Sequence, residues 1–455
     1  METLKIPFTY LLFKWKVCII GIRTREDREE CRKLYDVLNA YLENGLKIIL
    51  HKIPDAKMVA SGLWIRQGSV YENDQNNGLS HLLEHLLLNS ANNDCLAYQN
   101  FMEMASTEGV VYNAATTKEY TCFFFTGLPQ TLELCLDCLS CIAKDGRNFP
   151  KDFFDKEKKV VMQEAMSFYS SFQQIKERMS QALWGNTGAG RIIMGDINNI
   201  KNATIDQVKQ IMDDAYMPEN ATLIVVGNVE YTDALALIEQ KFSDWEDRSR
   251  AHRQELIESV PGIYYNKGNG DNTVLSIGFR APSYSSINRI AVDMLVRITG
   301  FSGMQSRMIQ EVRVKRGLAY TVGGFSNFYR NRGTVGFLSV CNKNKANEVA
   351  KVMMDVLQDV RDHGFKEEEI EREKHVMETS LLLEVDNITE HLRYIGKCSE
   401  MASDFYIENE IRRIRQLDVI KLNAALQEIM TEENMGLAAI GGCNFDKLLG
   451  TVNFA

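Results

Sequence analysis

Three ionisable side chains lie close together in an apolar stretch near residue 80. From Gly78 to Leu88 the sequence reads GLSHLLEHLLL, which contains His81, Glu84 and His85. Residues i and i+4 of a helix share one face, so both imidazoles could reach one ion. Neutral imidazole binds Zn²⁺ at about 2.0–2.1 Å, and a neighbouring carboxylate can take a proton from metal-bound water. This inverted form of the His-Glu-x-x-His motif predicts a zinc site.

The alternative is that chance placed two histidines on an amphipathic helix. The chain has only 7 His, and a random match to the pattern is expected on the order of once in a hundred chains. The flanking leucines also predict a buried helix, and buried histidines need partners. The motif therefore favours a metal.

A zinc site with two imidazoles needs a third protein ligand, and a carboxylate from a second helix is a common one. Glu157 and Glu164 lie in KEKKVVMQEAM, seven residues apart. That spacing is about two helical turns, so both face the same way. Taken alone, Glu157 is more simply explained as part of a solvated charged face. Three protein ligands would leave the fourth position for water.

Strand-like and helix-like stretches alternate along the 455 residues. Leu46 to His51 and Thr121 to Thr126 predict strands, while Leu132 to Ala143 has helical length and one apolar face. The mixture predicts an α+β fold, and the length predicts about two to four domains.

Two segments 214 residues apart resemble one another. Gln207 to Gly227 and Lys421 to Gly442 each read as an amphipathic helix, a short turn with an Asn, and an apolar strand. This repeat predicts an internal duplication, with a mainly antiparallel sheet and helices in each half. The expected division is an N-terminal extension (1–37), a catalytic zinc-peptidase domain (38–247), a linker (248–261) and a degenerate second copy (262–455).

The same offset compares the chemistry of the two halves. The region opposite His81, Met294 to Arg297, has no His-Glu-His pattern, and Glu164 falls opposite Glu378 or Thr379. Only the first half is therefore expected to carry the metal site.

The motif followed by Glu157 and Glu164 resembles the pitrilysin-type zinc peptidases, a family that includes insulin-degrading enzyme and the mitochondrial processing peptidase. The resemblance runs from about Leu42 to Gly442 and includes LENGL at Leu42, NAATTKE at Asn113 and GLAY at Gly317. It implies that His81, His85 and Glu164 bind one Zn²⁺ per chain. Glu84 would be the general base, and Glu157 an acidic helper behind the site.

The resemblance also assigns residues to the substrate. An extended peptide would pair with an edge strand formed by Asn113, Ala114, Ala115 and Thr116. In the second half, Arg313 and Tyr320 would lie against the scissile carbonyl, where a cation and a phenol can stabilise an oxyanion. From spacing alone, a solvated basic run and a core tyrosine would be the simpler explanation of those two.

Composition limits the partners and the compartment. The formal net charge is −9, which disfavours nucleic acid and weakly favours basic peptides. Lysines interrupt the apolar N-terminus, so no membrane span is expected. The 10 Cys show no C-x-x-C pairing, which indicates reduced core cysteines in a cytoplasmic protein.

By resemblance, the activity is that of a processing-type endopeptidase, of which leader or presequence removal is one form. Family members enclose their site between two two-domain halves, like a clamshell. Since one chain supplies two domains and carries both sets of residues, a homodimer is expected. Two alternatives stay open: the catalytic member of a heterodimer, and a non-catalytic scaffold or core-type subunit with this fold.

Overall fold

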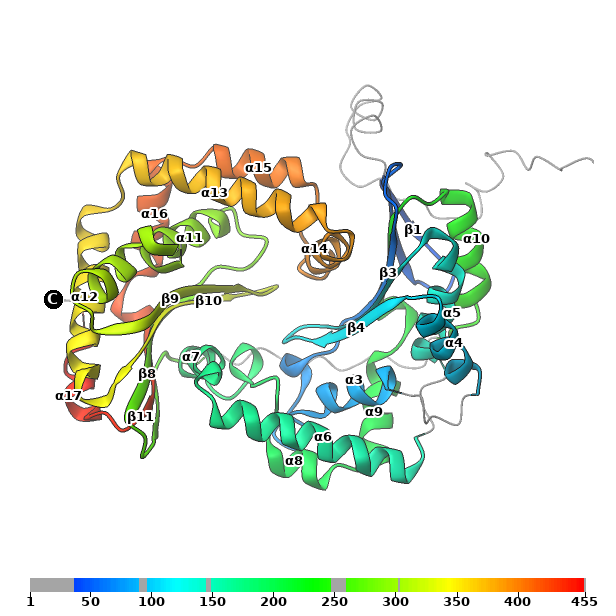
Figure 1. The fold of residues 1–455 in the computed structure, drawn as a ribbon, viewed down its shortest axis with the longest axis horizontal. Helices are drawn as coiled ribbons and strands as arrows, with labels where there is room; N and C mark the ends of the chain where they lie inside the picture. The colour runs from blue at the N-terminus through cyan, green and yellow to red at the C-terminus, as the bar shows by residue number, and fades with distance from the viewer. Residues whose placement is uncertain (1–36, 90–95, 145–148, 247–258, 302, 454–455) are drawn as a thin grey trace, which may run out of the picture.

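The computed structural model describes residues 37–89, 96–144, 149–246, 259–301 and 303–453 (Figure 1). The expected N-terminal extension, apart from its last residue, and most of the expected linker fall outside these ranges.

The first half contains a six-stranded sheet. Its order is β1-β2-β6-β3-β5-β4, and every neighbouring pair is antiparallel except β2 and β6. Strands β3, β5 and β6 are buried along their whole length, because helices cover both faces of the sheet. The two strands expected from sequence are confirmed as β2 and β5. The strands are β1 (Val37–Tyr41), β2 (Lys47–Lys52), β3 (Val59–Ile65), β4 (Val111–Thr116), β5 (Thr121–Gly127) and β6 (Ala221–Gly227).

The second half repeats this topology. Its order β7-β11-β8-β10-β9 matches β2-β6-β3-β5-β4 strand for strand, and its one parallel pair, β7 with β11, occupies the same place. The expected α+β fold with a duplicated architecture is therefore confirmed. The strands are β7 (Ile263–Lys267), β8 (Asn272–Ala281), β9 (Ala319–Phe328), β10 (Gly333–Asn342) and β11 (Met435–Gly441).

Equivalent helices fix the register between the halves. Helix α9 (Ile205–Ala215) and helix α16 (Val419–Ile429) are offset by 214 residues, as the sequence repeat predicts. Helices α6 (Lys151–Ser170) and α13 (Glu367–Asp386) are offset by 216, and their buried residues match at that offset. Glu164 therefore lies opposite Ser380. The expectation of Glu378 or Thr379 was wrong, because the loops before these helices differ in length.

The remaining α-helices cover the sheets and the ends of the molecule. Leu132 to Ala143, expected to be helical, is confirmed within α5. None of the described helices is both long and apolar enough to cross a membrane. The helices are α3 (Leu79–Leu88), α4 (Leu96–Thr107), α5 (Leu132–Lys144), α8 (Ile197–Asn202), α10 (Tyr231–Phe242), α11 (Arg289–Val296), α12 (Ala346–His363), α15 (Ile407–Arg415) and α17 (Phe445–Leu449).

The two halves exchange one helix each. Helix α7 (Ile175–Trp184) follows the first-half helices in sequence, but it packs on the second sheet through Met179 and Leu183. Its counterpart α14 (Ile388–Glu400) packs on β3 and β6 of the first sheet. Figure 1 shows both helices where the halves meet. This reciprocal packing joins the halves through apolar side chains.

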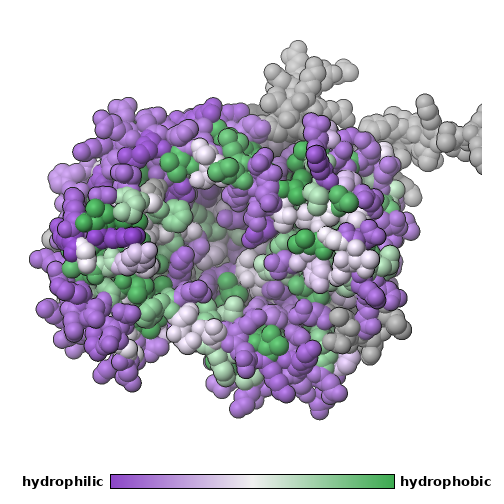
Figure 2. Space-filling view, in the orientation of Figure 1, coloured by the Kyte–Doolittle hydropathy of each residue, from purple (hydrophilic) through white to green (hydrophobic). Residues whose placement is uncertain are grey.

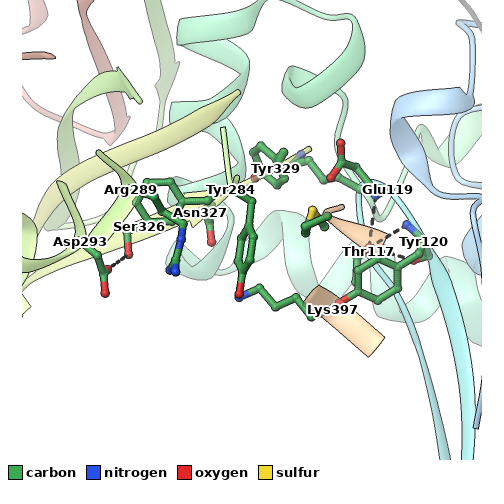
Figure 3. A pocket seen from close by; sticks show the side chains of 13 residues that line it. Thr117, Glu119, Tyr120, Tyr284, Arg289, Asp293, Ser326, Asn327, Tyr329 and Lys397 are labelled. Carbon is green, nitrogen blue, oxygen red and sulfur yellow. Dashed lines mark hydrogen bonds between the residues drawn. The ribbon is translucent and has the colours of Figure 1, made fainter. Parts of the chain in front are cut away.

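The halves also meet at two equivalent hairpin turns, between β4 and β5 and between β9 and β10. The backbone N–H of Arg330 donates to both carboxylate oxygens of Glu119, at 3.0 and 2.8 Å. Beside this contact is a pocket of about 320 Å³ that residues of both halves line, Tyr120 from one and Tyr284 and Lys397 from the other (Figure 3). Figure 2 shows the hollow between the halves.

The exchange of α14 requires close approach. Trp64 of β3 is buried, and a Cβ added to Gly396 of α14 would lie 2.1 Å from Trp64 Cε2. Only a residue without a side chain lets the helix pack flat against the indole.

We therefore expect Gly396→Ala to lower the free energy of unfolding by about 2 kcal/mol, because the indole must move in a close-packed core. Chemical denaturation measures this change. Gly270→Ala is the matched control, since its Cβ would meet no atom within 4 Å. Equal stability of the two variants would contradict the packing argument.

Candidate metal centre

Helix α3 carries the metal motif and is held on several sides. Its leucines are buried in the first-half core, and the helix packs against α6, α8, α9, β4 and β5. It starts after Gly78, whose φ of 102° is a left-handed conformation that favours glycine. A Cβ on Gly195 would lie 2.1 Å from the Cα of Gly78. These contacts fix the start of the helix and therefore the direction of its polar side chains.

Three predicted ligands converge at one point. Oε2 of Glu164, on α6, lies 3.7 Å from Nε2 of His81 and 3.3 Å from Nε2 of His85. Two ligand atoms of a tetrahedral zinc ion are themselves about 3.3–3.4 Å apart, given bonds of about 2.0–2.1 Å. The three ligand atoms lie within 4.8 Å of one another. The spacing is therefore close to that of a zinc coordination shell.

The state and exposure of these groups also fit a zinc ion. Burial, together with the neighbouring His85, lowers the pKa of His81 to about 3, so its imidazole is neutral and can bind a metal. The Glu164 side chain is 45% exposed, which leaves one side of the cluster open to water. Two imidazoles, one carboxylate and an open side are the donor set of a catalytic rather than a structural zinc site.

Glu157 lies behind His85. Its Oε2 is 3.6 Å from Nδ1 of His85, slightly beyond hydrogen-bond range, and it accepts a hydrogen bond of 3.3 Å from Asn89 Nδ2. A carboxylate at this place orients the ring so that the other nitrogen points to a metal. This is the position expected of the acidic helper. Sequence reasoning missed Asn89, which lies one helical turn after His85.

Glu84 is buried beside the cluster, and Thr116 of β4 holds it there. The Thr116 hydroxyl donates to Glu84 Oε2 at 2.5 Å. Burial raises the pKa of Glu84, while the hydrogen bond from Thr116 and the nearby His85 act in the opposite direction. The proposed base is thus fixed to the end of the proposed substrate strand, a contact that spacing alone did not indicate.

Strand β4, which contains Asn113 to Thr116, is at the edge of the first sheet. One side pairs with β5, and Val111 to Asn113 are exposed to solvent. An unpaired edge next to the cluster could accept another strand.

The structure places Arg313 and Tyr320 together but in the other half. The Arg313 guanidinium lies 4.3 Å from the centroid of the Tyr320 ring, and Tyr320 is 79% exposed at the start of β9. Among the described residues, no hydrogen bond or ion pair joins either side chain to the metal cluster. In Figure 1, β9 and α3 lie in different halves.

The second half has replaced the cluster with an ion pair. Glu373 of α13 is the counterpart of Glu157 at the offset of 216, and it is buried. Its Oε1 lies 2.6 Å from Nε of Arg297, at the end of α11, the helix equivalent to α3. A guanidinium beside this carboxylate excludes a metal cation.

Comparison with known proteins agrees with this geometry. The family described as insulinase (peptidase family M16) matches residues 47–197, and the one described as peptidase M16 inactive domain matches residues 202–377. An uncharacterized zinc protease of Mycobacterium leprae is 26% identical over 413 residues, 89% of this chain and 92% of that protein. The uncharacterized zinc protease YmxG of Bacillus subtilis is 26% identical over 393 residues, 86% of this chain and 95% of that protein.

Solved structures share the fold. A protease from Helicobacter pylori has a TM-score of 0.82 at 18% identity, covering 90% of this chain and 99% of that one. A chain of complex III from Candida albicans has a TM-score of 0.78 at 13% identity, covering 91% and 99%. The two matches to one family follow one another along most of the chain and include the metal motif, so this chain belongs to the insulinase family of peptidases, peptidase family M16.

Proposed function

We propose that the protein is a zinc metalloendopeptidase that cleaves extended peptides. The observation that carries this proposal is the convergence of His81, His85 and Glu164 beside the buried Glu84. The names of the relatives support zinc and proteolysis. A processing role, a cytoplasmic location and a preference for basic peptides stay predictions.

The protein groups divide the chemistry between them. Zinc, held by the two imidazoles and Glu164, supplies Lewis acidity that activates water and polarises a peptide carbonyl. Glu84 takes the proton of the attacking water and returns it to the leaving amine. Thr116 holds that carboxylate in place, and Glu157 keeps the ring of His85 directed at the cluster.

The substrate would bind as an added strand along β4. Main-chain pairing with Asn113 to Thr116 would carry the peptide past Glu84, because Thr116 ends the strand and binds that carboxylate. Pairing of this kind needs a free backbone. Flexible peptides are therefore the expected substrates, in preference to folded proteins.

The site would be completed by a second chain. Arg313 and Tyr320 lie in the half without the metal cluster, and Tyr320 is exposed. In a homodimer, the partner could supply both groups to the carbonyl oxygen. The alternative of a non-catalytic subunit predicts neither zinc binding nor hydrolysis, so the experiments below separate the two.

Glu164→Gln should weaken zinc binding roughly 100-fold or more, because a neutral amide replaces the anionic ligand. Elemental analysis after dialysis against a weak chelator measures the zinc retained per chain. Asp155→Asn, an acid-to-amide change on the same helix, is the control and should keep its zinc. Full zinc content in Glu164→Gln would remove Glu164 from the ligand set.

Glu84→Gln should bind zinc normally and lose peptide hydrolysis by roughly 10²–10⁴-fold, since the amide cannot accept the proton. A quenched peptide with and without chelator measures the activity, and Glu108→Gln, in an exposed turn, is the control. A Glu84→Gln enzyme that is as active as wild type would refute the assignment.

Mixing inactive Arg313→Ala and Glu84→Gln chains should restore part of the activity. If sites are shared, a mixed dimer has one site with both an intact base and an intact arginine. Activity is measured after the two proteins are dissociated and reassociated together, with each variant alone as control. A mixed dimer, detected by mass, that shows no activity would argue against shared sites.

A further inference from the structure

Glu72 is a buried carboxylate that the sequence analysis does not single out. It follows the short 3-10 helix Ser69–Tyr71, six residues before Gly78, and it is 1% exposed. A buried acidic side chain needs partners, and Glu72 finds them at the beginning of the metal-binding helix.

The carboxylate occupies the N-terminus of α3. Its Oε2 accepts hydrogen bonds from the backbone N–H of Gly78 at 2.9 Å and from Asn77 Nδ2 at 2.8 Å. Its Oε1 accepts from the backbone N–H of Ser80 at 2.7 Å. Backbone N–H groups at a helix start have no partner within the helix, so a remote side chain here does the work of an N-cap.

The contacts favour an ionised Glu72. Burial raises the pKa of its carboxyl, but the three N–H donors and the hydroxyl of Ser80 act against that increase. Gln67 Nε2 donates to the Ser80 oxygen at 3.0 Å, which leaves that hydroxyl's hydrogen for Glu72. Because all of these groups are donors, a proton on Glu72 would have no acceptor among them.

An anion at this place affects a cation at the cluster. The N-terminus of a helix carries a partial charge of about +0.5, which repels a divalent cation within the first turn. His81 is the third residue of α3 and therefore lies in that turn. A carboxylate bound to the same N–H groups cancels the repulsion and holds the turn in one conformation.

The second half provides an internal comparison. Residues 282–292, which precede and begin the equivalent helix α11, contain no acidic residue. The N-cap of α11, Asn288, makes no side-chain capping hydrogen bond. The half with Arg297 in place of a metal ligand thus has no carboxylate here, and the half with the imidazoles does.

We infer that Glu72 is a positioning residue for the metal: its carboxylate fixes the first turn of α3 and makes that helix end able to accept a divalent cation. The inference rests on the proposed zinc site and adds a residue outside the coordination shell. It predicts an effect on metal affinity that is separate from fold stability.

The experiment titrates metal-free protein with Zn²⁺ against a competing chelator. Glu72→Gln should bind zinc about tenfold more weakly, a typical cost for a supporting residue outside the coordination shell. Asp418→Asn is the matched control: Asp418 accepts from the backbone N–H of Lys421 at the start of α16, in the second half. It should bind zinc as wild type does, even if thermal unfolding shows an equal loss of stability.

Unchanged zinc affinity in folded Glu72→Gln, or an equal loss in Asp418→Asn, would overturn the inference. If Glu72→Gln does not fold, Glu72→Asp keeps the charge, and its affinity should stay within about threefold of wild type. A tenfold loss in folded Glu72→Asp would count against the role of the charge. Failure of wild type to bind zinc would instead refute the proposed function, so the two failures are distinguishable.

Discussion

The packing of α3 against α6 is the contact on which the site depends. It brings two imidazoles from one helix to a carboxylate from another, in a region where apolar side chains exclude most water. Polar groups in such surroundings are costly unless they have partners. The sheet beneath α3, the turn at Gly78 and the carboxylate of Glu72 hold the helix so that these partners meet. A metal ion would complete an arrangement that the protein core already imposes.

The two halves show how one architecture supports different chemistry. Their sheets have the same strand order, and their long helices bury matching positions. One half directs imidazoles at the point where its helices cross, and the other places Arg297 beside Glu373 there. Burial of that carboxylate is kept in both halves, but its partner differs. The fold is thus compatible with either outcome, and the side chains at the crossing decide the function.

The exchange of α7 and α14 makes the halves depend on each other. Each sheet is covered in part by a helix that belongs to the other half in sequence, so neither half buries its sheet fully alone. The bond between Glu119 and Arg330 adds a polar contact directly after the strand that ends in Thr116. The second half therefore supports the proposed substrate strand, although the metal ligands are all in the first.

The sequence by itself determined the metal motif, the helical face shared by His81 and His85, and the duplication, because these depend on periodicity and spacing within short segments. It identified Glu157 and Glu164 as a pair on one face. Only the tertiary structure decided that Glu164 meets both Nε2 atoms while Glu157 lies behind His85. The hydrogen bond from Thr116 to Glu84, the cap by Glu72 and the exchanged helices also required the fold. Such contacts join segments far apart in the chain, and local patterns do not encode which distant surface a side chain will face.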